Sequence, residues 1–270
     1  MNQDLKGEVR QFWQKEPCGT HFVPQIEDRR RFFSDLESHR YSLEPFIKPF
    51  ARFERGKGRR ILEVGTGAGT DFVNWVRNGA DAVGIDLTSS GIGLTRERLA
   101  LEGHTAKVAV GDAENLPFTD NALDLVYSCG VVHHTPNTQR AIDEIRRVLR
   151  PGGSASILIY HVPSWTGWVL WLRFCLARMR PCRTPRWAIF HHCESPGTKA
   201  YSVRAALKLF KEFSHAQARC QLTAGDLLLA RPQKPYKKWY YPIAWALYPR
   251  WLIRFSGNLF GYYILIDATK

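Results

Sequence analysis

The chain has 270 residues and a formal net charge of +13, a length that fits one large domain with insertions. Its first ten residues are polar and lack the apolar stretch of an export signal, so we do not expect secretion. Its six cysteines show no paired C-x-x-C spacing, which is typical of reduced thiols and indicates a cytoplasmic protein.

The positive charge is concentrated in one part of the chain. Residues 161–270 contain 17 Lys and Arg against four Asp and Glu, whereas residues 1–160 contain 21 of each. Seven of the nine tryptophans also lie after residue 160. An electrically neutral first part therefore precedes a basic, aromatic second part, for which this pattern indicates a binding partner.

The chain begins with segments that favour helices. Residues 4–15 carry Val9, Phe12 and Trp13, and residues 27–53 form a longer helical stretch with a break before Pro45. We expect residues 1–55 to form an N-terminal helical cap. Phe12 and Trp13 either pack that helix onto the rest of the protein or cover a bound ligand.

The most informative stretch follows this cap. An apolar strand over 60–64 includes Glu63 and leads into Gly65, Gly67 and Gly69, after which residues 70–78 favour a helix. Glycines at these positions let the backbone approach a ligand that side chains would block. The spacing differs from the dinucleotide fingerprint, and no Gly-Lys-Ser/Thr follows, which excludes a Walker loop.

Alternating strands and helices continue to residue 160. A second strand near 81–85 ends at Asp86, and a third near 106–110 precedes Asp112. A fourth strand near 124–128 leads into a pair of histidines. Helices over 91–102 and 138–149 separate these strands; Pro151 and two glycines end the last helix, and a fifth strand covers 154–160.

The pattern E-x-G-x-G-x-G and the segments after it resemble class I S-adenosylmethionine (SAM)-dependent methyltransferases. The resemblance is closest to the type-11 small-molecule group, which includes ubiquinone and menaquinone methyltransferases, and it covers residues 60–160. It implies SAM as the cofactor. The cofactor-binding residues it implies are Glu63, Gly65, Gly67, Gly69, Asp86, Leu87, Asp112, Ala113 and Cys129. In that family the acid at Asp86 meets the ribose hydroxyls, and the acid at Asp112 accepts the adenine amine.

The expected fold is α/β: a Rossmann-like, seven-stranded, mostly parallel sheet with helices on both faces. Helical insertions follow strand 5 and separate strands 6 and 7. We divide the chain into the cap, a SAM-binding core over 56–160, a helical insertion or substrate cap over 161–215, and a C-terminal part over 216–270. In the last two parts we expect a helix over 203–213, strands over 216–223 and 260–268, and an insertion over 224–259.

Two segments rich in aromatic and basic residues, 165–180 and 234–255, lack the roughly 20 uninterrupted apolar residues of a membrane span. One interpretation places their rings and cations on an anionic membrane surface, so that the protein is peripheral on the inner face of the membrane. The other makes them an aromatic cap that closes an apolar pocket. Both interpretations favour an apolar or amphiphilic methyl acceptor.

Three residues are candidate bases. His133 and His134 follow strand 4, and Tyr160 ends strand 5, so all three can reach the end of the cofactor cleft that holds the methyl group. A structural role is the alternative for each histidine. The segment 194–201 either lines the acceptor site or forms a turn before a helix capped by Ser202.

The sequence thus predicts methyl transfer to a small molecule or lipid-like substrate, without a metal, since the cluster at 191–193 has no second half-site. An RNA methyltransferase that uses the basic part is one alternative; residues 128–131 lack its N-P-P-Y box, so we do not expect nucleic acid as the partner. A SAM-binding partner protein without catalysis is another. The sequence leaves open whether O, N, C or S receives the methyl group.

Overall fold

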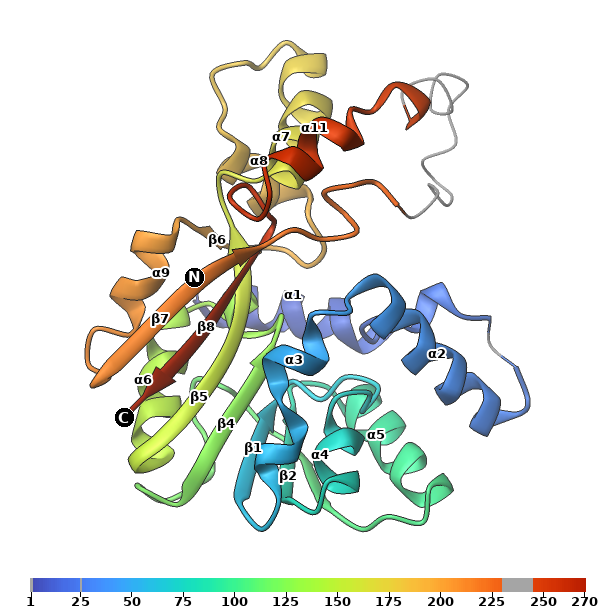
Figure 1. The fold of residues 1–270 in the computed structure, drawn as a ribbon, viewed down its shortest axis with the longest axis vertical. Helices are drawn as coiled ribbons and strands as arrows, with labels where there is room; N and C mark the ends of the chain where they lie inside the picture. The colour runs from blue at the N-terminus through green and yellow to red at the C-terminus, as the bar shows by residue number, and fades with distance from the viewer. Residues whose placement is uncertain (1, 25, 230–244) are drawn as a thin grey trace.

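The computed structural model describes residues 2–24, 26–229 and 245–270. Its centre is a sheet in the order β3-β2-β1-β4-β5-β8-β7, in which all strands but β8 run parallel (Figure 1). This confirms the predicted mostly parallel, Rossmann-like sheet. The strands are β1 (Arg60–Val64), β2 (Asp81–Asp86), β3 (Lys107–Val110), β4 (Leu123–Cys129), β5 (Leu149–His161), β6 (Ala200–Tyr201), β7 (His215–Gln221) and β8 (Tyr263–Thr269).

Helices cover both faces of the sheet. The N-terminal ones are α1 (Asn2–Lys15), α2 (Arg29–Leu43) and α3 (Ile47–Ala51), with short 3-10 turns η1 (Thr20–Phe22) and η2 (Phe53–Gly56). The core adds α4 (Phe72–Arg77), α5 (Ser89–Leu101), η3 (Val132–His134) and α6 (Thr138–Val148). Later elements are α7 (Trp165–Phe174), η4 (Leu176–Arg178), α8 (Pro185–His192), α9 (Val203–Leu209) and α11 (Arg250–Phe255).

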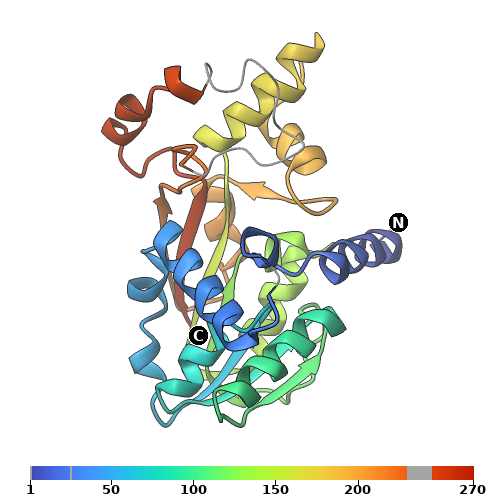
Figure 2. The same ribbon diagram turned by 90° about the vertical axis from the view of Figure 1, so that its right-hand side faces the viewer.

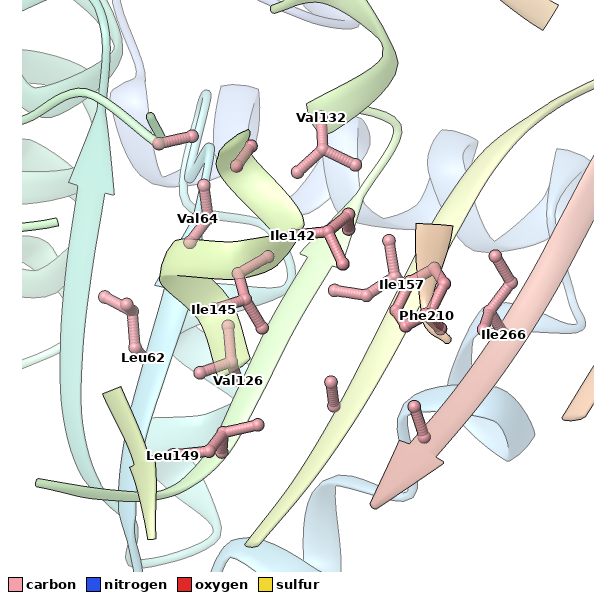
Figure 3. Packing of buried hydrophobic residues seen from close by; sticks show 14 of the residues in the cluster. Leu62, Val64, Val126, Val132, Ile142, Ile145, Leu149, Ile157, Phe210 and Ile266 are labelled. Atoms are coloured by element: carbon pink, nitrogen blue, oxygen red, sulfur yellow. The ribbon is translucent and has the colours of Figure 1, made fainter. Parts of the chain in front are cut away.

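The alternation of side chains along each strand divides the core into two layers. Leu62, Val126 and Ile157 pack with α6 and α9 on one face of the sheet (Figure 3). Their neighbours Leu125 and Leu158 point the other way and pack with α3, α4 and α5. A sheet buried on both faces holds the carboxyl ends of its strands in fixed positions, and the loops that follow those strands inherit that rigidity.

The start of the fifth strand differs from the prediction. We expected residues 154–160, but β5 begins at Leu149 and runs through Pro151 and both glycines. Leu149 pairs with Leu123, and the register then shifts so that Leu125 pairs with Ser154. The last residue of the chain also bonds to this bulge, since the Lys270 N–H donates to the Gly153 carbonyl. Pairing with residues far away in sequence therefore extends the strand through Pro151 and both glycines, which by themselves would predict a turn.

The insertions lie next to the carboxyl end of β5 and the amino end of β8, at the top of Figures 1 and 2. Residues 161–200 form α7, η4, α8 and the short β6, which pairs with the end of β5. The helix predicted over 203–213 ends earlier, at Leu209. The predicted antiparallel pair is confirmed as β7 and β8. Residues 230–244, which include the first half of the basic segment 234–255, lie outside the described residues.

One buried carboxylate joins these insertions to the core. Asp226 is fully buried, and its Oδ1 accepts hydrogen bonds from the N–H and hydroxyl of Thr166 on α7. Its Oδ2 accepts from the N–H and hydroxyl of Thr223 and from the N–H of Tyr262. A single side chain therefore satisfies donors from three segments, which fixes α7 against the start of β8.

The substitution Asp226→Ala should lower the free energy of unfolding by about 3 kcal/mol or more, because several buried donors lose their acceptor together. Asp226→Asn keeps one acceptor oxygen and should cost less. Urea denaturation followed by circular dichroism would measure both. Wild-type stability of the alanine variant would contradict this role.

Candidate active site

The glycine loop after β1 has the backbone that its glycines permit. Gly65, Gly67 and Gly69 all have positive φ, at 83°, 53° and 74°, a region that other residues rarely adopt. A Cβ on Gly65 would lie 2.2 Å from a methyl group of Val131, so only glycine fits between the loop and the segment after β4. The loop thus lies directly against that segment.

Asp86, at the end of β2, is fastened to this loop. Its Oδ2 accepts a hydrogen bond of 2.9 Å from the Gly67 N–H, and its Oδ1 accepts from the N–H and the hydroxyl of Thr88. Gly91 leaves room for the carboxylate, since a Cβ there would lie 2.8 Å from Cγ of Asp86. The carboxylate is therefore held in one orientation at the cavity wall.

Asp112, after β3, has a partner that sequence analysis did not find. Nζ of Lys6 on α1 lies 2.6 Å from Oδ2 of Asp112 and 2.8 Å from Oε2 of Glu114. Burial opposes the charge of Lys6, but the hydrogen bonds with both carboxylates outweigh it and raise its pKa. This contact holds α1 over the cavity; a single lysine in a polar helix gives no signal of it.

Arg40 on α2 is, after Lys6, a second cation of the site that the sequence did not predict. Nε and Nη2 of Arg40 donate to the two oxygens of buried Asp71 at 3.1 and 2.8 Å, and Nη1 donates to Glu44. Burial acts to raise the pKa of Asp71, but Arg40 and the Tyr127 hydroxyl bring it below its usual value. Burial and nearby Asp71 instead raise the pKa of Glu63 well above its usual range.

These groups line one cavity of about 570 Å³. Eight of the nine residues expected to bind cofactor line it, and Gly69 does not; the eight are Glu63, Gly65, Gly67, Asp86, Leu87, Asp112, Ala113 and Cys129. Phe12 and Trp13 line it too, and α1 lies between the core sheet and the insertion helices (Figures 1 and 2). Among the described residues the cavity wall is acidic: Lys6 and Arg40 are its cations, against the acids Glu16, Glu44, Glu63, Asp71, Asp86, Asp112 and Glu194.

The cavity continues past β4 into an aromatic half. Tyr160 at the end of β5 and Tyr262 and Tyr263 at the start of β8 line it, with ring centroids 4.3 and 5.6 Å from that of Tyr160. The insertion adds Cys193 and Glu194 to the same wall. The Tyr160 hydroxyl donates to Oε2 of Glu194 at 2.6 Å. Strand order therefore places the acid-rich half and the tyrosine-rich half side by side.

The three candidate bases occupy different positions. His134 lines the cavity, and its Nδ1 lies 2.8 Å from the Ser195 hydroxyl. Burial, with a contribution from Lys199, lowers the pKa of His134 to about 3. Tyr160 also lines the cavity, but burial and Glu194 raise its pKa well above 10, so it keeps its proton at neutral pH.

His133 does not line the cavity. It is fully buried, and its ring centroid lies 3.9 Å from that of Tyr160 and 4.1 Å from that of His134. Burial lowers its pKa well below its usual value. This position fits the structural alternative better than the catalytic one.

Within the described residues, no group of three or more His, Cys, Asp or Glu side chains is arranged to hold a metal ion.

Comparison with known proteins agrees with this geometry. Residues 62–157 match the model of a methyltransferase domain. The core of this chain is a class I SAM-dependent methyltransferase domain. The phthiotriol/phenolphthiotriol dimycocerosates methyltransferase of Mycobacterium tuberculosis is 40% identical over 98 residues, 36% of each chain. An uncharacterised protein of the same organism is 35% identical over 128 residues, 47% of this chain and 44% of that one. The chain thus spans less than half the length of these relatives.

Solved structures share the methyltransferase fold at lower identity. A putative methyltransferase from Haloferax volcanii, in complex with the activator Trm112, is 17% identical with a TM-score of 0.62, over 97% of this chain and 96% of that one. A phosphoethanolamine N-methyltransferase from Haemonchus contortus, bound to S-adenosylhomocysteine, has a TM-score of 0.55 at 17% identity and covers 84% of this chain and 52% of that one.

For this methyltransferase domain, Asp86→Ala should weaken S-adenosylhomocysteine binding by about 1.5–3 kcal/mol, because charge-assisted hydrogen bonds to the ligand are lost. Asp81→Ala is the control, since Asp81 begins the same strand and is 71% exposed. Isothermal titration calorimetry would measure both. Equal affinity of wild type and Asp86→Ala would remove this acid from the site.

His133→Phe should preserve methyl transfer and change the pH dependence of stability. The folded-state pKa of His133 lies below its unfolded value near 6.5. Below that pH the unfolded chain binds a proton that the folded protein does not, so the free energy of unfolding is fully retained above that pH and falls as pH drops below it. Removing this imidazole should reduce the loss of unfolding free energy between pH 7 and pH 5, where the uptake of one proton accounts for up to about 1.4 kcal/mol per pH unit. Urea titrations would show this, with exposed His215→Phe as the control. An inactive variant would restore His133 as a candidate base.

Proposed function

We propose that this chain transfers the methyl group of SAM to a small apolar or amphiphilic molecule. The observation that carries the proposal is the continuous cavity, whose acidic half at the ends of β1, β2 and β3 joins a tyrosine-lined half at β5 and β8. A cofactor site alone would need only the first half. The second half provides room for an acceptor next to it.

The residues present fit the cofactor. Asp86 keeps a lone pair on Oδ2 for a ribose hydroxyl, because Oδ1 already accepts two hydrogen bonds from Thr88, and Asp112 can accept from an adenine amine while Lys6 holds it. Glu63 and Arg40, beside the glycine loop, would face the amino-acid end. When bound, SAM supplies a methyl group that its sulfonium has already activated.

The chain then has to align the acceptor and exclude water. Leu158 and the three tyrosines give the acceptor half an apolar surface, and Trp13 of α1 closes the wall beside His134, 5.3 Å from it between ring centroids. Alignment of an already activated donor and a nucleophile is the main contribution such an enzyme makes. A relative named for the methylation of phthiotriol dimycocerosates supports a lipid-like acceptor.

We also propose that the insertions meet an anionic membrane surface. Eleven of the twelve exposed large hydrophobic side chains among the described residues follow residue 161. On and beside α11 they include Leu247, Trp251 and Phe255, which are 77%, 74% and 87% exposed, and exposed Arg254 directly precedes Phe255 in the sequence. Exposed rings next to cations are typical of membrane interfaces. No helix in the described part of the chain is long and apolar enough to span a bilayer.

The insertions also serve as a cap, because Thr166, Cys193 and Glu194 line the cavity from the same segments. Trp165 joins the two insertions through its indole N–H, which donates to the Ser256 hydroxyl. The inner side of the insertions thus closes the acceptor half, while the outer side carries exposed rings. This arrangement supports an acceptor that enters from a lipid surface.

Incubation with methyl-labelled SAM tests the function. We expect label to move into a lipid extract and not into RNA, because phosphate binding would need exposed cations at the cavity and the described cavity wall is acidic. Label in RNA would favour an RNA methyltransferase. Binding of S-adenosylhomocysteine without transfer to either fraction would favour a non-catalytic role.

The double substitution Trp251→Ser with Phe255→Ser should reduce co-sedimentation with anionic vesicles at least tenfold, because each ring buried in lipid contributes about 1.5–3 kcal/mol. The matched control is Val110→Ser, an exposed residue of β3 that lies outside the insertions. Unchanged sedimentation of the double variant would remove the membrane proposal and leave the cap.

A further inference from the structure

Glu194 is set apart from the other acids after residue 160 by its position on the cavity wall and by its backbone conformation. It is one of only four acids after residue 160, and it faces the cavity rather than one of the many cations of that region. Its backbone has φ of 51°, a left-handed conformation that non-glycine residues seldom adopt and that is common at functional sites. Buried Ser195, bonded to His134, follows it directly and holds the turn.

The carboxylate of Glu194 is fixed on one side and open on the other. Its Oε2 accepts from the Tyr160 hydroxyl at 2.6 Å and lies 3.5 Å from Nε2 of His134. The side chain is nevertheless 41% accessible, and it lines the cavity. A carboxylate held in this way presents negative charge to whatever occupies the acceptor half.

Aromatic rings surround the same space. Trp13, Tyr160, Tyr262 and Tyr263 all line the cavity, and the rings of Tyr160 and Tyr263 are stacked within 8° of parallel. The Tyr160 ring packs against Tyr262, Tyr263 and His133, with centroids 4.3, 5.6 and 3.9 Å away, so the tyrosines form an aromatic wall beside Glu194. A carboxylate inside such a group of rings is complementary to an ammonium ion and unfavourable for an anion.

The cations of the cavity wall do not offset this charge. Lys6 is paired with Asp112 and Glu114, and Arg40 with Asp71 and Glu44. Glu44 also accepts a hydrogen bond of 2.8 Å from the Tyr263 hydroxyl, which links the Arg40 pair to the tyrosines. As far as the described residues define it, the acceptor half of this protein, whose net charge is +13, is therefore locally acidic.

We propose that the acceptor is an amine, which is bound as its ammonium ion between the tyrosines and Glu194, and that Glu194 takes up its proton before methyl transfer. This proposal rests on the proposed function and specifies its substrate class. An ammonium nitrogen has no lone pair and cannot attack the methyl group until one N–H bond breaks. The proton moves to the Glu194 carboxylate, and the freed pair forms the new N–C bond.

The S–C bond breaks as that bond forms, and its electron pair stays on sulfur, so that the products are a methylated ammonium ion and a neutral thioether. Packing around Glu194 raises its pKa from its ordinary value although part of the side chain is accessible, and the hydrogen bond from Tyr160 acts in the opposite direction. Tyr160, which keeps its own proton, remains a hydrogen-bond donor to the ionised form.

Three probes of the same shape and different charge test the proposal: 2-phenylethylamine, 2-phenylethanol and phenylacetate. Calorimetry with saturating S-adenosylhomocysteine should show the amine binding at least tenfold more tightly than the alcohol, with phenylacetate weakest. In Glu194→Gln the amine and alcohol should bind within about threefold of each other, with unchanged affinity for S-adenosylhomocysteine. Glu212→Gln, which removes an acid outside the cavity, should keep the preference.

Labelled SAM tests the proton transfer. Methylation of 2-phenylethylamine, identified as an N-methyl product by mass spectrometry, should fall at least a hundredfold in kcat in Glu194→Gln and stay unchanged in Glu212→Gln. The proposal is overturned if the alcohol binds as tightly as the amine, if the amine fails to bind at millimolar concentration, or if Glu194→Gln keeps the preference or the turnover. Failure of the proposed function would differ, since S-adenosylhomocysteine would then not bind, or would bind while no label moves from SAM into a lipid extract.

Discussion

The reversal of strand order between β1 and β4 is the constraint on which the site depends. The chain builds β1, β2 and β3 outward in one direction and then returns to place β4 and β5 on the other side of β1. The loops after β1 and β4 therefore diverge, and a crevice opens at the carboxyl ends of the strands. Gly65 and Val131 lie against each other there, and eight of the nine expected cofactor residues line the cavity, together with His134 and Tyr160.

The two sides of that crevice differ in chemistry because different parts of the chain supply them. The first side comes from the core, which provides a carboxylate at the end of each strand and fastens Asp86 to the glycine loop. The second side comes from β5, β8 and the insertions, which provide three tyrosines and Glu194. Asp226 joins these later segments, so the acceptor wall is positioned by one buried carboxylate.

The parts of the site that could be predicted are those fixed by local geometry. Positive φ at Gly65 and an acid at the end of β2 follow from short patterns, and eight of nine expected cofactor residues line the cavity. Tyr160 and His134 reached the cavity because their strands end there. The order of the elements was likewise predictable, since apolar strands and helices alternate along the core.

The remainder depended on contacts between distant segments. Lys6 and Arg40 lie on helices where a cation usually faces solvent, and only the folded chain brings them to Asp112 and Asp71. The early start of β5 required Leu123 and Lys270, far away in sequence. The sequence allows two interpretations of the segment 194–201, a wall of the acceptor site or a turn before a helix. The position of Glu194 beside Tyr160 depends on tertiary packing, which the spacing of residues along the chain does not predict.

A crystal structure of the protein with S-adenosylhomocysteine would test the central claim most directly. We expect the adenine beside Asp112, the ribose on Asp86 and the sulfur at the boundary between β1 and β4, facing Tyr160. A nucleoside bound in the tyrosine-lined half, or outside the cavity, would contradict it.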